Sequence, residues 1–295
     1  MIDRVRVATP ESDRSRIVLD TSAGRNLGQS EAEPPYLSVL SEMKAAGYVI
    51  HLADGAWAEL LNQRNRGSMS DAVFERVISR LDRILNSDVP VFLSGSDLRG
   101  YLGEDVGEPA WTEADFVGTS GRAMAFLRNA TILTPNVQLA GGQRAAEEVL
   151  QEAREAWMSH FDRMLEELPP TTEDDELGGP TFEAFRRMVD SESDLPHPHM
   201  SRRMDLGIRY AWRQHVRRNR AREPYNPASH RRRNDGIDFD LYYFLMLPAL
   251  LVTDDTGFGA RLEPIQSFQR SWIYTPEQLA AAWRSGTIAM PTWPT

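Results

Sequence analysis

The chain has 295 residues, of which 41% are hydrophobic and 26% charged, enough to build one large domain or two smaller ones. It contains no cysteine, which excludes disulfides, thiolate metal sites and a cysteine nucleophile. The formal net charge of -10 argues against passive binding of nucleic acid over the whole surface, but the charge is unevenly spread: residues 202–233 are rich in arginine and residues 166–176 are strongly acidic.

Residues 1–16 are polar and charged and lack the apolar core of a secretory signal. The most apolar stretch, residues 241–252, contains Pro248 and is far shorter than the roughly 20 residues that span a bilayer. We therefore expect a cytoplasmic protein that makes no membrane contact.

The first part of the chain alternates between strand and helix patterns. Residues 16–20 (RIVLD) form a short apolar run that ends on Asp20, as buried parallel strands do. A helix is expected from residue 34 up to Gly47, then a second strand over residues 48–52 and a helix that Asp54 would cap and that carries Glu59. This rhythm predicts an α/β sheet.

The middle of the chain changes character. Helical periodicity covers residues 70–85, 112–127, 143–168 and 181–189, with one further strand candidate at residues 89–93. We therefore predict that residues 66–229 are a mostly helical insertion. The domain around it is predicted to be discontinuous and to consist of residues 1–65 and 230–295.

The strand and helix rhythm returns near the end of the chain. Residues 237–246 read as a helix, residues 249–253 as a strand followed by Asp254 and Asp255, and residues 272–274 as a further strand. Thr275 then begins a helix with Gln278 completing a capping box. The two ends of the chain are therefore predicted to build one sheet between them.

Four acidic residues are expected to meet at one edge of that sheet. Asp20 and Asp255 follow strands, while Glu59 and Asp238 lie near the N-terminal halves of helices that point to the same edge. Clustered carboxylates raise one another's pKa, and a hard cation such as Mg²⁺ or Mn²⁺ would neutralise them. Asp235 and Asp240 remain alternatives to Asp238 as the third acid.

The order of these motifs resembles that of PIN-domain nucleases: Asp20 with Thr21 after the first strand, Glu59 on an early helix, Asp238, and a Val-Thr-x-Asp strand end at Asp255. The resemblance covers about the first 65 and last 70 residues. It implies a three-layer α/β/α fold and a Mg²⁺- or Mn²⁺-dependent endoribonuclease, since the family cleaves RNA more often than DNA. The central insertion departs from compact members of the family.

Candidate contacts to nucleic acid are Thr21 and Thr253 beside the acids and the three consecutive arginines Arg231, Arg232 and Arg233 before them. The wider segment 202–233 also carries aromatic residues, which stack on bases in single-strand binding proteins. The alternative is an arginine-laced helix that docks on the acidic segments of its own chain.

Three other functions compete with this expectation. A haloacid-dehalogenase-type phosphatase needs an aspartate two residues after its nucleophile, and position 22 is Ser. A PIN-like scaffold could instead serve as a catalytically silent binding or regulatory module. A toxin-type ribonuclease would be controlled by a protein partner, and a homo-oligomer is equally compatible with the sequence.

Overall fold

The computed structural model describes residues 15–95, 97–98, 112–131, 137–168, 171–172, 175–176, 178–192, 200–218, 220, 224–229, 232, 234–247 and 249–291. Their centre is an all-parallel sheet of five strands in the order β3-β2-β1-β4-β5. The strands are β1 (Arg16–Leu19), β2 (Val49–Ala53), β3 (Val91–Phe92), β4 (Ala249–Val252) and β5 (Ile273–Tyr274). The α/β class predicted from the sequence is confirmed.

The two ends of the chain meet in the middle of this sheet. Strand β1 pairs with β4, so that Ile17 lies beside Leu250 although the two residues are far apart in sequence. Every residue of β1 and β4 is buried, and all of them except Arg16 are apolar, which explains why both read as apolar runs. Edge strand β3 comes from the interval predicted as an insertion, while the division into domains stays a prediction.

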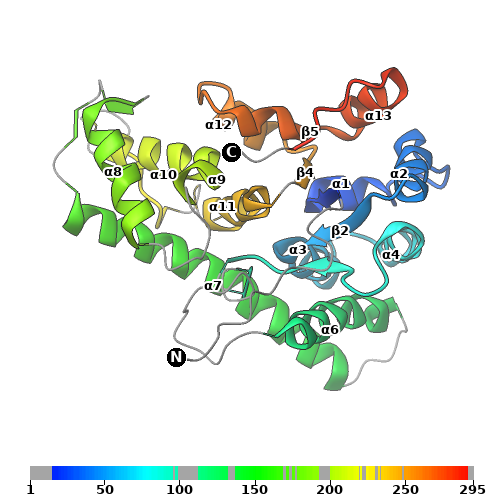
Figure 1. The fold of residues 1–295 in the computed structure, drawn as a ribbon. Helices are drawn as coiled ribbons and strands as arrows, with labels where there is room; N and C mark the ends of the chain where they lie inside the picture. Colours follow the sequence, from blue (N-terminus) through cyan, green and yellow to red (C-terminus); the bar gives the residue numbers. More distant parts are fainter. Residues whose placement is uncertain are drawn as a thin grey trace, which may run out of the picture.

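Helices lie on both sides of the sheet, an arrangement consistent with three layers (Figure 1). In Figure 1, α2 and α4 lie to one side of the strands, and α11 lies to the other side with the long helix α7. The helices are α1 (Thr21–Asn26), α2 (Pro35–Ala45), α3 (Asp54–Asn65), α4 (Asp71–Ile84), α6 (Glu113–Thr131), α7 (Val137–Glu167), α8 (Pro180–Glu192), α9 (Met200–Arg203), α10 (Asp205–Arg218), α11 (Asp235–Tyr243), α12 (Thr256–Leu262) and α13 (Pro276–Ser285), with 3₁₀ turns η2 (Phe244–Met246) and η3 (Phe268–Trp272). No helix in the described ranges is long and apolar enough to cross a bilayer.

Local signals set most helix ends. Gly47 has a φ of +99°, the left-handed conformation that stops α2. Thr275 and Gln278 form the predicted capping box of α13. The predicted cap at Asp54 is wrong, because Asp54 is the first residue of α3 and its carboxylate accepts hydrogen bonds from Trp57 Nε1 (3.0 Å) and the Ser94 amide (3.4 Å) instead.

Helix α7, which belongs to the predicted insertion, packs against both α3 and α11. The approach to α11 is so close that a Cβ added at Gly236 would lie 2.5 Å from the carbonyl oxygen of Ala153. Only glycine fits there, because backbone atoms cannot move aside cheaply. This contact fixes where the first turn of α11, with Asp238, lies.

Candidate functional site

Asp20 lies directly after β1 and is held by three donors. The Thr253 hydroxyl donates to its Oδ2 at 2.7 Å, the Ser22 hydroxyl at 2.9 Å, and the Thr21 amide donates to Oδ1 at 2.5 Å. Burial raises the pKa of Asp20, and the hydrogen bonds from Thr253 and Ser22 only partly oppose this rise. The three hydrogen bonds therefore fix the orientation of the Asp20 carboxylate, and burial disfavours its ionised form.

Glu59 reaches the same place from the first turns of α3. The Thr21 hydroxyl donates to Glu59 Oε2 at 2.5 Å, which links the two carboxylates through neighbouring residues. Burial is the main cause that raises the pKa of Glu59 to about 7, and the negative charges of Asp20 and Asp255 add to the rise. The Thr21 hydrogen bond and the cation of Arg154 act in the opposite direction.

Asp255 follows β4, the strand next to β1, and caps helix α12. Its Oδ1 accepts from the amides of Gly257 (2.7 Å) and Phe258 (3.0 Å), two donors that have no partner inside the helix. The Asp255 amide in turn donates to Thr253 Oγ1 at 3.2 Å. Thr253 therefore connects the two strand-end aspartates, while Asp255 itself is exposed to solvent.

Asp238 comes from the first turn of α11 and pairs with Arg261 of α12. Burial raises the pKa of Asp238 to about 8; the cation of Arg261 lowers it, while the charges of Asp20, Glu59 and Asp255 raise it. These mutual effects show that the acids from four separate elements share one electrostatic environment.

The two alternative third acids lie elsewhere. Asp235 is 3% exposed, accepts a hydrogen bond from the Tyr225 hydroxyl (3.0 Å) and lies 3.9 Å from an Arg232 nitrogen. Asp240 lies with Asp54 and Ser94; burial, followed by the charge of Asp54, raises its pKa to about 8. Of the three aspartates on α11, Asp238 is the one grouped with Asp20 and Glu59.

The expected nucleic-acid contacts have other partners. Thr21 and Thr253 are 7% and 5% exposed, and both hydroxyls hold carboxylates. Arg232 pairs with Asp235 and lies over the ring of Tyr225 at 5.8 Å. Arg231 and Arg233 lie outside the described residues.

Sequence reasoning missed two cations and a serine. Arg261 could not be singled out because its pairing with Asp238 joins two helices, and Arg154 is brought near Glu59 by the packing of α7. The Ser22 hydroxyl accepts from the Asp254 amide (2.7 Å) and donates to Asp20, so it ties the two strand ends together. Its position two residues after Asp20 was the one signal available in advance.

The site offers only oxygen ligands to a cation, and the excess negative charge would favour one. Within the described part of the chain, however, no three Asp, Glu or His side chains lie in positions that could hold a metal ion as they stand. Glu59 is engaged by Thr21, and Asp238 by Arg261. A cavity of about 280 Å³ lies beside Asp255, between α12 and β5, and of the four acids only Asp255 lines it.

No protein-family model, no curated protein and no solved structure matches the chain.

Proposed function

We propose that this chain is a PIN-like nuclease that uses Mg²⁺ or Mn²⁺ to hydrolyse phosphodiester bonds, with RNA as its expected substrate. The observation that carries the proposal is the convergence of Asp20, Glu59, Asp238 and Asp255 from four elements; burial raises the pKa of Glu59 and Asp238, and the charges of neighbouring acids raise it further. Groups with strongly shifted pKa values are concentrated at functional sites.

The position of the acids in the fold supports the same function. Asp20 and Asp255 follow the neighbouring parallel strands β1 and β4, whose carboxyl ends define the ligand-binding edge of an open α/β sheet. The order of the acids along the chain is the one that the resemblance to PIN-domain nucleases requires.

A hard divalent cation suits this set of ligands, because all of them are carboxylates and the chain has no cysteine. Asp20 and Asp255 would hold the cation directly, and Glu59 and Asp238 would complete its shell. When bound, the cation would supply Lewis-acid stabilisation of the charge that develops on the phosphate.

The protein's own groups then have separate tasks. Glu59 would complete the shell of the cation or orient the attacking water, and the Thr21 hydroxyl fixes the direction of its carboxylate. Arg261 and Arg154 bring positive charge to the cluster and would contact the phosphate of a substrate.

A catalytically silent binding or regulatory module is the second candidate. The observation in its favour is that Arg261 already neutralises Asp238, and that the described acids do not form a ready ligand set. A toxin-type ribonuclease held inactive by a protein partner is a form of the first proposal.

The test is cleavage of labelled single-stranded RNA, structured RNA and DNA in Mn²⁺, Mg²⁺ or EDTA. Asp20→Asn and Asp255→Asn are assayed beside Glu263→Gln, an exposed residue at the end of α12. We expect metal-dependent cleavage by the wild type and the Glu263 variant, with a loss of at least about 100-fold in both aspartate variants.

A thermal-shift titration gives a second reading of the same site. Mn²⁺ should raise the melting temperature of the wild type and leave that of Asp20→Asn unchanged, because a ligand stabilises only the state that binds it. No cleavage and no metal-dependent shift would favour the binding module. Equal cleavage by wild type and aspartate variants would indicate a contaminant and refute the site.

A further inference from the structure

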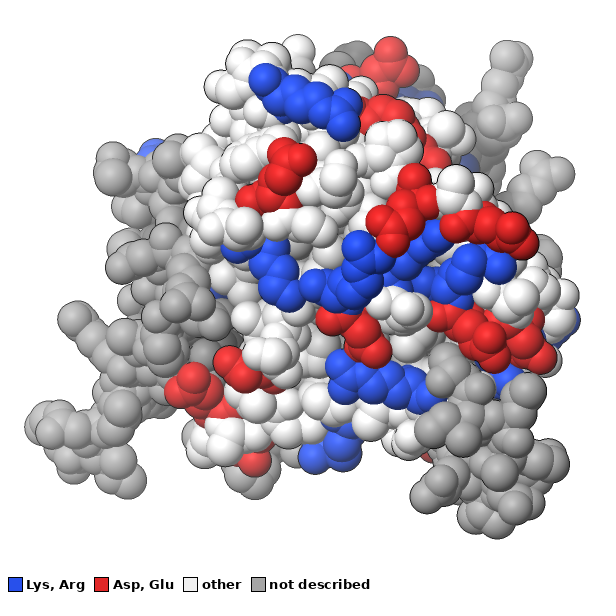
Figure 2. Space-filling model, turned by 90° about the vertical axis from the view of Figure 1, so that its right-hand side faces the viewer, with Lys and Arg blue, Asp and Glu red and all other residues white. Residues whose placement is uncertain are grey.

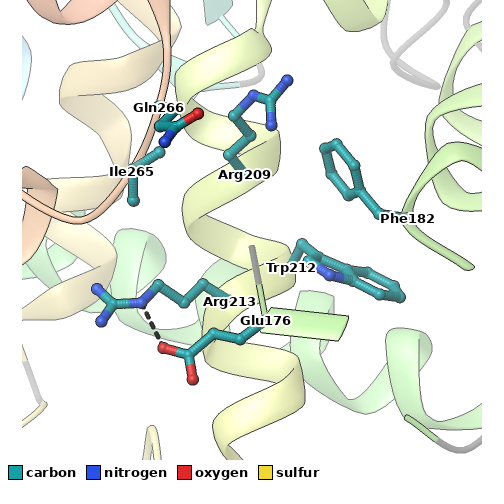
Figure 3. Close-up of a pocket in the computed structure, with 7 residues that line it drawn as sticks. All are labelled: Glu176, Phe182, Arg209, Trp212, Arg213, Ile265 and Gln266. Carbon is teal, nitrogen blue, oxygen red and sulfur yellow. Dashed lines mark hydrogen bonds and ion pairs between the residues drawn. The ribbon is translucent and has the colours of Figure 1, made fainter. Parts of the chain in front are cut away.

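A groove of about 500 Å³ lies beyond the C-terminal end of α12, away from the carboxylate cluster. Its walls come from four elements and include Arg186 of α8, Arg202 of α9, Arg209 of α10 and Phe268 of η3. A smaller cavity of about 70 Å³ is next to it and shares two of its lining residues, Arg209 and Gln266. Figure 3 shows the smaller cavity, with Arg209 and the aromatic rings on one side of it.

The groove carries positive charge although the chain as a whole is acidic. Arg186, Arg202 and Arg209 face a single carboxylate in its lining, that of Asp205, which pairs with Arg209 at 2.9 Å, while Arg186 pairs at 3.6 Å with Glu183, which is not part of the lining. Arg202 is exposed and makes no ion pair with any described residue. By contrast, basic and acidic side chains are intermingled on the face that Figure 2 shows, on the side of α2 and α4.

The acid of the smaller cavity does not cancel this charge. Glu176 is paired with Arg213 at 2.7 Å (Figure 3). It is also paired with Arg220, and it is 11% exposed. A phosphate in the larger groove would therefore meet arginines whose charge is only partly compensated.

Aromatic rings lie among the arginines. Phe268 is one of the few large apolar side chains that the described residues expose, at 44%, and its ring meets that of Trp272 edge to face at 5.3 Å. Phe182 is 2% exposed and packs against the guanidinium groups of Arg209 (5.1 Å) and Arg186 (5.8 Å), so Phe268 is the ring that is free to stack. Arginines that grip phosphates beside rings that stack on bases characterise single-strand binding sites.

The groove is physically connected to the carboxylate cluster. Helix α12 runs seven residues from the cap Asp255 to Leu262, which corresponds to about 10 Å. Arg213 of the small cavity donates to the carbonyl oxygen of Arg261, whose side chain holds Asp238. A strand of a few nucleotides could therefore lie in the groove and reach the cluster.

We propose that this groove binds single-stranded nucleic acid, with Arg202 and Arg209 at its phosphates and Phe268 stacked on a base. Cleavage of the bound strand rests on the proposed nuclease function, whereas binding of the strand does not depend on that function. The occupant is a phosphodiester chain with unpaired bases, which RNA and DNA share.

The experiment measures binding in EDTA, where metal-dependent cleavage cannot occur, by fluorescence anisotropy of labelled single-stranded RNA, single-stranded DNA and duplex DNA. Arg202→Glu and Phe268→Ala are compared with two matched controls that do not line the groove. These are Arg187→Glu, an exposed arginine on the same helix as Arg186, and Met290→Ala, an apolar side chain that is 47% exposed and contacts Tyr48 before β2.

We expect Arg202→Glu and Phe268→Ala each to weaken binding of single strands by about 5- to 100-fold, because stacking and phosphate contacts of this kind have that size. Arg202→Ala should also reduce the slope of log K against log salt by about 0.7. Asp20→Asn should bind like the wild type, so loss of cleavage and loss of binding are separable.

Two results overturn the proposal. One is the absence of binding by the wild type to any single strand at low salt. The other is equal affinity of Arg202→Glu and Phe268→Ala with their controls. Tighter binding of single-stranded RNA than of single-stranded DNA would identify RNA as the ligand. Equal binding of the two would show that the groove recognises the phosphates and unpaired bases that they share.

Discussion

His51 in the middle of β2 provides a quantitative test of how this sheet is packed. The side chain is fully buried, its Nδ1 donates to the carbonyl oxygen of Val89 at 2.6 Å, and its Nε2 has no hydrogen-bond partner among the described residues. Burial, and to a smaller degree the charge of Arg16, lowers the pKa of His51 to about 3 from a normal value of 6.5. The imidazole is therefore neutral in the folded protein.

This shift makes stability depend on pH. Below about pH 6.5 the unfolded chain binds a proton on His51 that the folded protein cannot accept, so the stability contributed by the neutral ring is complete above that pH and disappears as the pH falls toward 3. With about 1.36 kcal/mol per unit, the loss is about 2 kcal/mol at pH 5 and at most about 5 kcal/mol at pH 3.

The measurement is urea unfolding followed by tryptophan fluorescence at pH 8, 7, 6 and 5, for the wild type and His51→Gln. The glutamine can still donate to Val89 but does not titrate. The raised pKa values of Asp238 and Asp240 affect both proteins equally and cancel in the difference. The variant should gain about 2 kcal/mol relative to the wild type between pH 8 and 5. Parallel curves over that range would refute the reasoning.

Three further predictions concern packing and caps. Gly236→Ala should destabilise the protein by about 1–3 kcal/mol and reduce any nuclease activity, because the methyl group would meet the backbone of α7. Gly259→Ala, in open space on α12, is the control and should be neutral or stabilising. Equal unfolding midpoints of the two variants in urea would contradict this prediction. Arg80→Met should cost about 2–3 kcal/mol, because the buried guanidinium holds three backbone carbonyls of residues 27–31, and an unchanged urea midpoint would show that this loop does not need it. Thr275→Ala should cost about 1 kcal/mol by removing the capping box of α13, and a thermal-melting comparison with Thr275→Ser, which keeps the hydroxyl, checks that the cap is the cause.

The sequence was sufficient for features that depend on neighbouring residues. The apolar run Ile17–Leu19 is typical of a strand that is buried on both faces, and Gly47 and Thr275 act on the turn of backbone next to them. Asp20 and Asp255 could be placed for the same reason, because Asp20 directly follows β1 and Asp255 lies three residues after the end of β4.

Features that join distant segments were decided only by the tertiary structure. Strand β3 is two residues long, and its place at the sheet edge depends on pairing with β2. The choice among Asp235, Asp238 and Asp240 depends on how α11 is rotated about its axis. Successive residues of a helix point about 100° apart, so the face that packs on α7 and α10 decides which acid turns toward Asp20.

The roles of the arginines in residues 202–233 were also decided only by the tertiary structure. The composition of residues 202–233 left open whether they bind an external anion or the chain's own acids. Tertiary packing divided them, since Arg213 and Arg220 neutralise Glu176 whereas Arg202 stays exposed beside Phe268. The physical reason is that the sequence determines how many charged side chains a segment carries. Which of those charges remain without an ion-pair partner depends on the residues that the fold places next to them.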